Sequence, residues 1–489
     1  QDFNLVGSPF AGMLYELHGN QGSQTQEDLC YDSWMGYMNT PTPFTSNVNN
    51  TTYYVRWNSY WGRQYGNVMS PARQVIRLAK ENGLPMFETW ANLIRILSMS
   101  RVSAIHGPVI YSNYGSTAAT VLYDKESDLY NLFFAQLDTI QTQFNANKTY
   151  AGFAKFDPSY KGSIPAWQKV VNSVRLKLAM RISKVNPALA KTQGEKALAD
   201  ANGLIATNAD NFNISLLGNI MPVGMICFQW DDARMGAPIE SFMVGLKDGR
   251  IAKYFSPADN ASLYADHPTS PYKGIRNGAF LDAKIQRVTF SKVSTDFNSV
   301  QTRRHFTASE VHFLRAEAAL RGWTGAGDAK TNYETGVRLS FADWGAGGVD
   351  AYLADATSKP INYVDPVDSR NNFTATSTIT VAWDEADSRE LKLEKIMTQK
   401  YLATFTNTLE AWVDHRRTGY PKIPSAARND SGDEWGVIPA GQFIKRWPFV
   451  AGEVTGNAAA VTDALSKMGA TKNDISTRLW WDTGVASNF

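Results

Sequence analysis

Two consecutive amphipathic segments between residues 386 and 420 constrain the fold more than any other part of the sequence. In the first segment apolar side chains recur at intervals of four residues: Leu393, Met397, Tyr401 and Phe405. This spacing places them on one face of a helix. A second helical segment follows and ends at Gly419, because glycine favours helix termination. Two such helices cannot bury their apolar faces alone, so further helices must pack against them.

The same periodicity predicts those further helices along most of the chain. The predicted helices lie at about residues 54–65, 71–82, 86–105, 126–146, 165–185, 188–206, 307–323, 329–341, 386–405 and 409–418. The pair within 307–341 has the length and the small and aromatic positions that are typical of one tetratricopeptide repeat. The sequence therefore predicts a mostly α fold built from tetratricopeptide-like helix pairs.

The helical parts alternate with loop-rich parts, and we interpret the chain as one unit, residues 1–489. Helical-repeat parts span about 54–206 and 303–420, a loop-rich insertion spans about 207–302, and a C-terminal loop region spans about 421–489. The first 56 residues are also predicted to be loop-rich, because Gly, Asn, Thr and Pro are frequent there. A few short strands are predicted in the insertion, at about 224–230 and 285–291.

Composition narrows the class of partner. The 489 residues carry a net charge of only +2, which argues against nucleic acid or an anionic membrane as the main partner. Cys30 and Cys227 are too few for a disulfide scaffold, and the sequence leaves open whether they pair. No run of about 18 apolar residues occurs, so no transmembrane helix is predicted. The chain begins at Gln1, and we interpret it as a processed form whose signal peptide or lipidated cysteine lies upstream.

Sequence motifs for catalysis and cofactor binding are absent. There is no P-loop, H-E-x-x-H, C-x-x-C or G-x-S-x-G motif, and the six histidines show no metal-ligand spacing. We therefore predict no enzyme activity, no cofactor and no metal. Three carboxylate pairs have the chemistry for glycosidic acid/base work or for calcium: Asp231–Asp232, Asp384–Glu385 and Asp433–Glu434. Solvated loop charges are the favoured interpretation of these pairs.

Aromatic side chains are interleaved with polar ones in two loop-rich stretches. A sugar ring packs its C–H face on a flat aromatic side chain, while its hydroxyl groups need fixed donors and acceptors. The predicted ligand-binding residues are Tyr31, Asp32, Trp34 and Tyr37 in the first stretch, and Trp230, Asp232, Arg234 and Tyr272 in the insertion. Any one of them is more often a residue that anchors a loop to the core. Ligand binding also requires that the two groups converge in space.

Several blocks of the sequence resemble one known family. They are AWQKVVNSVRLKLAMRISKVNPALA at 166–190, EVHFLRAEAALRGW at 310–323, KIMTQKYLATFTNTLEAWVDHRRTGYPKI at 395–423 and RLWWD at 478–482. Their residues, order and spacing are similar to those of the SusD/RagB family of nutrient-binding outer-membrane lipoproteins. The opening stretch SPFAGMLYEL with GYMNTPTPF also resembles this family, so the likeness covers most of the chain.

The resemblance implies a SusD-like fold with four tetratricopeptide-like helix pairs and a loop-rich second region. It implies a lipid anchor on an upstream cysteine, exposure on the outer surface of the outer membrane, and a SusC-like TonB-dependent transporter as partner. It implies glycans as the usual ligands, although some members take peptides or other nutrients. Ligand positions vary within the family, so the resemblance assigns no binding residue.

We therefore expect a surface-exposed, non-catalytic protein that binds a nutrient and passes it to a transporter. An oligosaccharide is the leading hypothesis for that nutrient. Two alternatives remain open from the sequence. One is a glycoside hydrolase on a helical scaffold, in which Asp232 or Glu434 would be needed for turnover. The other is a tetratricopeptide-type scaffold that binds a protein segment in its helical groove.

Overall fold

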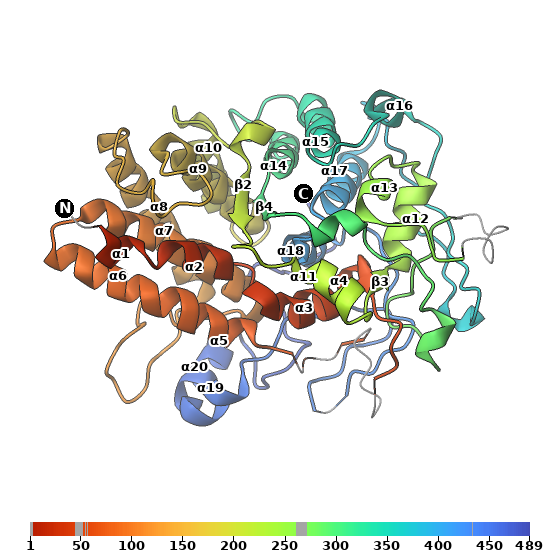
Figure 1. Cartoon of the computed structure of the whole chain (residues 1–489), viewed down its shortest axis with the longest axis horizontal. Helices are drawn as coiled ribbons and strands as arrows, with labels where there is room; N and C mark the ends of the chain where they lie inside the picture. Colours follow the sequence, from red (N-terminus) through yellow and green to blue (C-terminus); the bar gives the residue numbers. More distant parts are fainter. Residues whose placement is uncertain (1–2, 45–51, 54, 56, 261–270, 433) are drawn as a thin grey trace.

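The computed structural model describes residues 3–44, 52, 53, 55, 57–260, 271–432 and 434–489. Helices account for most of the regular structure in these residues, and the strands are few and short. In Figure 1 the long helices fill the left and upper parts of the molecule, while loops and short helices fill the lower right. The predicted mostly α fold is confirmed.

The first group of long helices forms a series in which each helix packs against the next. The series comprises α6 (Ser70–Glu81), α7 (Pro85–His106), α8 (Glu126–Ala146), α9 (Ile164–Arg181) and α10 (Pro187–Ala199). Local sequence sets their ends. Pro85 occupies the first turn of α7, and Gly107 follows its last residue with a φ of 102°. The side chain of Ser163 caps α9 by accepting a hydrogen bond from the amide of Ala166.

The second group of helices includes the two amphipathic segments. It comprises α14 (Ala308–Leu320), α15 (Ala329–Asp343), α16 (Val349–Ala354), α17 (Arg389–Ala403) and α18 (Thr408–Thr418). The apolar face predicted at 386–405 is buried, and α17 packs against α14 and α15. Because α14 also contacts α9, the two groups share one core. Paired packing of α9 with α10 and of α14 with α15 gives the predicted tetratricopeptide-like arrangement.

The N-terminal segment contains more helix than the sequence indicated. Its elements are α1 (Asn4–Gly7), α2 (Phe10–Glu16), η1 (Asn20–Gly22), α3 (Ser23–Gln26), η2 (Glu27–Tyr31), α4 (Asp32–Met35), α5 (Tyr60–Gln64) and η3 (Tyr65–Met69). The loop-rich prediction for the first 56 residues is therefore wrong for most of residues 4–35. The helix predicted at 54–65 begins only at Tyr60. Short segments of this kind form because tertiary packing overrides their weak periodicity.

Two small antiparallel sheets join distant parts of the chain. Strand β1 (Met38–Asn39) pairs with β3 (Arg234–Met235), and β2 (Phe212–Ser215) pairs with β4 (Thr302–Phe306). The strands predicted at 224–230 and 285–291 are wrong. The first range holds the end of α11 (Pro222–Gly224) and the π-helix η5 (Met225–Gln229), and the second overlaps the 3-10 helix η7 (Lys284–Gln286). Apolar runs this short do not distinguish a strand from a helical turn.

The insertion and the C-terminal region are otherwise built from short helices and loops. In the insertion these are η4 (Asn208–Asp210), α12 (Ala237–Gly245), α13 (Ile251–Tyr254) and η8 (Thr295–Asn298). Further along the chain lie η9 (Ser369–Asn371), α19 (Ala451–Gly456) and α20 (Ala458–Lys467). None of the helices in the described ranges is long and apolar enough to cross a membrane. Cys30 and Cys227 are both buried and do not form a disulfide.

Buried ion pairs tie the two helix groups together. The carboxylate of Glu410 on α18 lies 3.7 Å from Arg101 of α7, 3.5 Å from Lys177 of α9 and 3.4 Å from Arg181 of α9. Lys177 also lies 2.9 Å from Glu310 of α14. Burying a charge away from water costs free energy unless the charge is paired. The packing of these helices must therefore keep the paired groups together. Burial opposes ionisation of Glu410, but Lys177 and the two arginines lower its pKa.

Candidate functional site

The first group of predicted ligand residues lies in the core. Tyr31, Asp32, Trp34 and Tyr37 are each at most 4% exposed. In this structure their side chains cannot reach a ligand at the surface. Their burial favours a structural role, and we do not propose them as ligand contacts.

The packing partners of these rings explain their burial. Tyr31 lies 5.3 Å from Trp412 and 5.3 Å from Trp447 between ring centroids. Tyr37 stacks on Tyr401 at 4.3 Å. All three partners come from the C-terminal part of the chain, more than three hundred residues later in the sequence. The aromatic residues of the N-terminal segment thus complete the core around α17 and α18.

Trp230, from the second predicted group, lies on the surface. Trp230 is 46% exposed, which is more than any other aromatic residue that the structure describes. It follows the last residue of η5, and its amide donates a hydrogen bond of 3.2 Å to the carbonyl of Met225. A wide apolar ring is therefore presented to solvent at the end of an ordered helical turn.

The residue after Trp230 is held by one buried and one partly exposed cation. Asp231 has a left-handed backbone with a φ of 56°. Its Oδ1 accepts a hydrogen bond of 2.7 Å from Nη2 of Arg234 and lies 2.9 Å from Nζ of Lys292. Partial burial opposes ionisation, but Lys292 and Arg234 lower the pKa of Asp231. Arg234 is itself fully buried and donates to the carbonyl of Val288 at 2.8 and 3.0 Å, which favours a supporting role over a ligand contact.

Asp232 joins three segments of the chain. Its Oδ1 accepts a hydrogen bond of 2.6 Å from Oγ1 of Thr42 and one of 3.1 Å from Nζ of Lys284. Its amide donates to the carbonyl of Ile226 at 2.9 Å. Asp232 is partly exposed, so the predicted site residue does reach the surface. Much of its acceptor capacity is already used by the protein.

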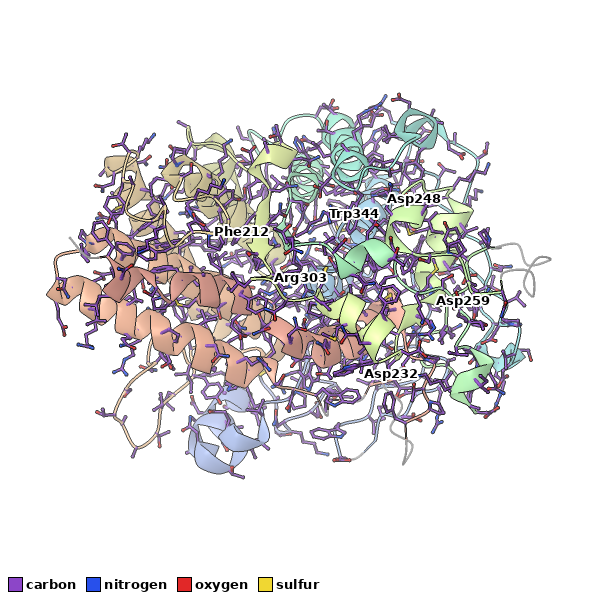
Figure 2. All side chains as sticks on the ribbon, in the orientation of Figure 1. Phe212, Asp232, Asp248, Asp259, Arg303 and Trp344 are labelled. Carbon is purple, nitrogen blue, oxygen red and sulfur yellow. The ribbon has the colours of Figure 1, made fainter. Side chains whose placement is uncertain are left out.

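Hydrogen bonds join the insertion to the C-terminal part as well. Nδ2 of Asn277 donates to the carbonyl of Pro424 at 2.8 Å, and the amide of Arg428 donates to the carbonyl of Gly278 at 2.7 Å. The name "loop face" is given to the surface formed by residues 40–44, 228–232, 277–287, 424–432 and 434–438. Figure 2 labels one of its residues, Asp232. Binding residues often lie on such loops, positioned by a rigid scaffold.

Several partly exposed rings accompany Trp230 on the loop face. They are Phe44, Phe228, Phe280 and Trp435. Tyr272, the remaining predicted site residue, is half-buried and packs against the core. The sequence reasoning missed Thr42, Lys284 and Lys292, which have no local signal because their importance comes from contacts with distant residues. Asp231 was noticed only as half of a carboxylate pair.

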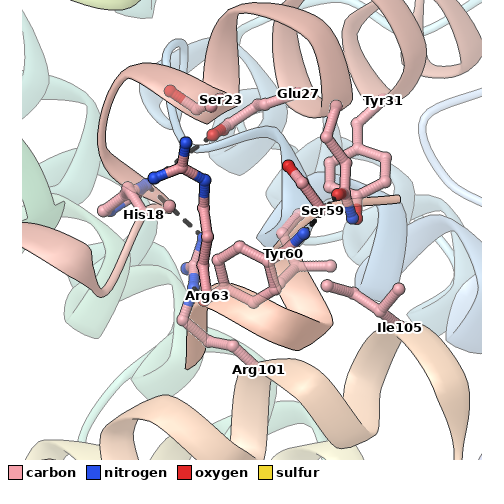
Figure 3. A pocket seen from close by; sticks show the side chains of 13 residues that line it. His18, Ser23, Glu27, Tyr31, Ser59, Tyr60, Arg63, Arg101 and Ile105 are labelled. Atoms are coloured by element: carbon pink, nitrogen blue, oxygen red, sulfur yellow. Dashed lines mark hydrogen bonds and ion pairs between the residues drawn. The ribbon is translucent and has the colours of Figure 1, made fainter. Parts of the chain in front are cut away.

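The cavity drawn in Figure 3 is a different feature, lined by the N-terminal segment, α7 and Leu409 of α18. His18, Glu27, Arg63 and Arg101 are among the residues that line it, and its volume is about 10 Å³. That volume holds about one water molecule, so the cavity cannot take a sugar. Burial and the nearby Arg303 and Arg101 keep the pKa of His18 well below its usual value.

The carboxylates considered for catalysis or calcium lie in different settings. Asp231 and Asp232 are paired with cations as described above, and Glu385 is exposed and lies 2.9 Å from Lys392. Asp433 lies outside the described residues. Within the described ranges, no group of three or more His, Cys, Asp or Glu side chains is arranged to hold a metal ion. The loop face as described offers rings and neutralised charges, which suit an uncharged ligand.

Comparison with known proteins finds matches over nearly the whole chain. A family model for SusD-like proteins, described as SusD and RagB outer membrane lipoprotein, matches residues 1–482. The chain belongs to the SusD-like family. That description makes the family one of outer-membrane lipoproteins, in agreement with the resemblance of the sequence blocks. No curated protein matches the chain.

Solved structures of SusD homologues share this fold over nearly their whole length. A chitin-binding SusD homologue from Flavobacterium johnsoniae is 39% identical, with a TM-score of 0.91 and 98% of each chain covered. A SusD homologue from Bacteroides uniformis is 32% identical, with a TM-score of 0.87, covering 99% of this chain and 100% of that one. A SusD homologue from Bacteroides vulgatus is 29% identical, with a TM-score of 0.91 and 99% of each chain covered.

Proposed function

We propose that this SusD-like protein is a non-catalytic binding protein for a neutral oligosaccharide, and we favour a chitin oligosaccharide. The observation that carries the proposal is the exposed indole of Trp230 on the loop face. The 39% identity to a chitin-binding homologue supports the choice of ligand. Tyr272 is retained as a second, half-buried candidate contact, and Asp232 as a partly exposed one.

The physical basis is the match between a flat apolar ring and the C–H face of a sugar. Packing the two together removes apolar surface of both from water. The acetamido groups of chitin add donors and acceptors that polar loop residues can satisfy. The charges beside Trp230 already pair with one another, Asp231 with Arg234 and Lys292, and Asp232 with Lys284. An uncharged ligand therefore fits this surface, and its binding should depend little on salt.

Calorimetric titration tests the ligand class. We expect chitin oligosaccharides to bind, and oligosaccharides without acetamido groups or with acidic groups to bind more weakly. Chromatography of the same mixtures after long incubation should recover the oligosaccharide intact. Shortened products would instead identify a glycoside hydrolase and would end the binding-protein proposal.

The delivery step is a further part of the proposal. We infer that the protein is held by a lipid anchor upstream of this chain, faces the exterior, and passes its ligand to a SusC-like TonB-dependent transporter. The family description as outer-membrane lipoprotein supports the location. Affinity purification from detergent-solubilised outer membranes should recover one β-barrel transporter in stoichiometric amount. The scaffold alternative predicts a different result. The purification would then recover a soluble protein that binds through a peptide segment, and substitutions in the helical groove would abolish that binding.

A further inference from the structure

The turn that follows the exposed Trp230 has a left-handed backbone at a charged residue. An L residue with positive φ costs free energy, so it persists only where surrounding contacts hold it. Here the residue is Asp231, with a φ of 56°. Its carboxylate is bound by Arg234 at 2.7 Å and by Lys292 at 2.9 Å.

We propose that Asp231 is a positioning residue whose carboxylate fixes the orientation in which the indole of Trp230 receives the oligosaccharide. This inference rests on the proposed function of the loop face. It adds that affinity depends on a charged group that need not touch the ligand.

The backbone geometry shows why a clamp on Asp231 acts on Trp230. The two residues share a peptide bond directly after the end of η5. The amide of Trp230 donates to Met225, and the amide of Asp232 donates to Ile226, at 3.2 and 2.9 Å. The indole therefore projects from a turn whose far side is fixed by the Asp231 carboxylate.

The clamp itself is anchored in the core. Arg234 is fully buried and binds the carbonyl of Val288, so its guanidinium cannot follow a moving loop. Nζ of Lys284 lies 3.6 Å from Oδ2 of Asp231 and adds a weaker contact. Without the carboxylate, we expect the turn to sample several conformations. The ligand would then have to order the indole, which lowers affinity.

A double-mutant cycle separates positioning from direct contact. The variants are Trp230→Ala, Asp231→Asn and the double variant, each titrated with a chitin oligosaccharide. Asn tolerates the left-handed backbone, so Asp231→Asn removes the charge while keeping the turn accessible. We expect a loss of affinity of about tenfold or more for Trp230→Ala, and of about three- to tenfold for Asp231→Asn. In the Trp230→Ala background, Asp231→Asn should cause no further loss.

Each other outcome overturns the inference in a recognisable way. Additive losses would show that Asp231 acts independently of Trp230. Wild-type affinity in Asp231→Asn would show that the carboxylate is not needed. Unchanged affinity in Trp230→Ala would refute the binding site proposed at Trp230. This outcome distinguishes failure of the proposed function from failure of the positioning role of Asp231.

A spectroscopic readout checks that the effect is local. The difference in near-ultraviolet circular dichroism between the parent and its Trp230→Phe derivative reports the ordering of this indole. We expect that difference to shrink in Asp231→Asn while the melting temperature stays close to that of wild type. The matched control is Asp350→Asn. Asp350 is an exposed residue of α16 that pairs with Arg338 of α15, so this variant also removes one paired carboxylate. A difference spectrum unchanged in Asp231→Asn would contradict positioning.

Discussion

Thr42 donates a hydrogen bond of 2.6 Å to the carboxylate of Asp232, 190 residues further along the chain. This bond joins the N-terminal segment to the insertion beside the exposed Trp230. Lys284 binds the same carboxylate oxygen from a third segment at 3.1 Å. The loops of the loop face are therefore connected before any ligand arrives, which reduces the entropy that binding must overcome.

Removing the Thr42 hydroxyl should loosen this connection. Thr42→Val keeps the shape of the side chain but cannot donate to Asp232. We expect the free energy of unfolding to fall by about 0.5–1 kcal/mol, and affinity for the oligosaccharide to fall more than this small change in stability would cause. Urea unfolding and titration of the same preparation measure both effects. Thr142→Val, which removes an exposed helical hydroxyl bonded to the carbonyl of Asp138, should change neither affinity nor the loop face.

The buried aromatic residues of the N-terminal segment should affect stability without affecting recognition. Trp34 is buried and donates through Nε1 to the carbonyl of Thr52 at 3.2 Å. We expect Trp34→Ala to lower the free energy of unfolding by about 3–5 kcal/mol, while the protein that remains folded binds with the wild-type dissociation constant. Titration corrected for the folded fraction measures this. If the milder Trp34→Phe weakened binding at unchanged stability, the original assignment of Trp34 to the site would be restored.

The buried cluster around Glu410 should be needed for the assembly of the helices. Glu410→Gln leaves Arg101, Lys177 and Arg181 without their shared carboxylate, and uncompensated buried charge is costly. We expect a loss of about 3–5 kcal/mol in the free energy of unfolding. Guanidinium unfolding at neutral pH is the measurement. Glu81→Gln is the matched control, because Glu81 forms an exposed pair with Arg77 at 2.8 Å, and we expect it to change stability by less than about 0.5 kcal/mol.

The free energy of unfolding should depend on pH because two buried acids, Asp28 and Asp32, lie close together. Burial, with neighbouring carboxylates, raises the pKa of Asp28 well above its usual value and that of Asp32 to about 8. In the unfolded chain both groups ionise near pH 4, so the folded state holds the extra protons. The stability that these protons provide is present below about pH 4 and is lost as the pH rises towards 8.

Asp28→Asn should remove part of that dependence. We expect the variant to be more stable than wild type at pH 8 and to lose less stability between pH 5 and 8, because one ionisation no longer opposes folding. Thermal unfolding across this pH range, with Asp350→Asn as the control, is the measurement. Parallel curves for wild type and Asp28→Asn would show that the pair is not protonated in the folded protein.

The sequence predicted the long helices because their periodicity is local. The range predicted as 126–146 coincides with α8, and 71–82 lies within a residue of α6 at each end. The start of α14 is also set locally, because the side chain of Thr307 accepts a hydrogen bond from the amide of Glu310. Such features depend only on residues within a few positions of one another.

The site was predicted less well because burial is decided by distant residues. Tyr31 and Trp230 occur in similar local surroundings, among polar and turn-forming neighbours. Only the folded chain places Tyr31 against Trp412 and Trp447 and leaves Trp230 open to solvent. The supporting cations Lys284 and Lys292 are likewise separated from Trp230 by more than fifty residues, so no local pattern connects them.

The central claim is that the exposed indole of Trp230 binds a neutral oligosaccharide. The most direct test is calorimetric titration of a chitin oligosaccharide into wild type, Trp230→Ala and Trp383→Ala. Trp383 is a half-buried tryptophan that packs on Tyr333 of α15 and serves as the control. We predict salt-independent binding by wild type, an affinity about tenfold lower or worse for Trp230→Ala, and near-wild-type affinity for Trp383→Ala. Equal affinity of wild type and Trp230→Ala would contradict the account.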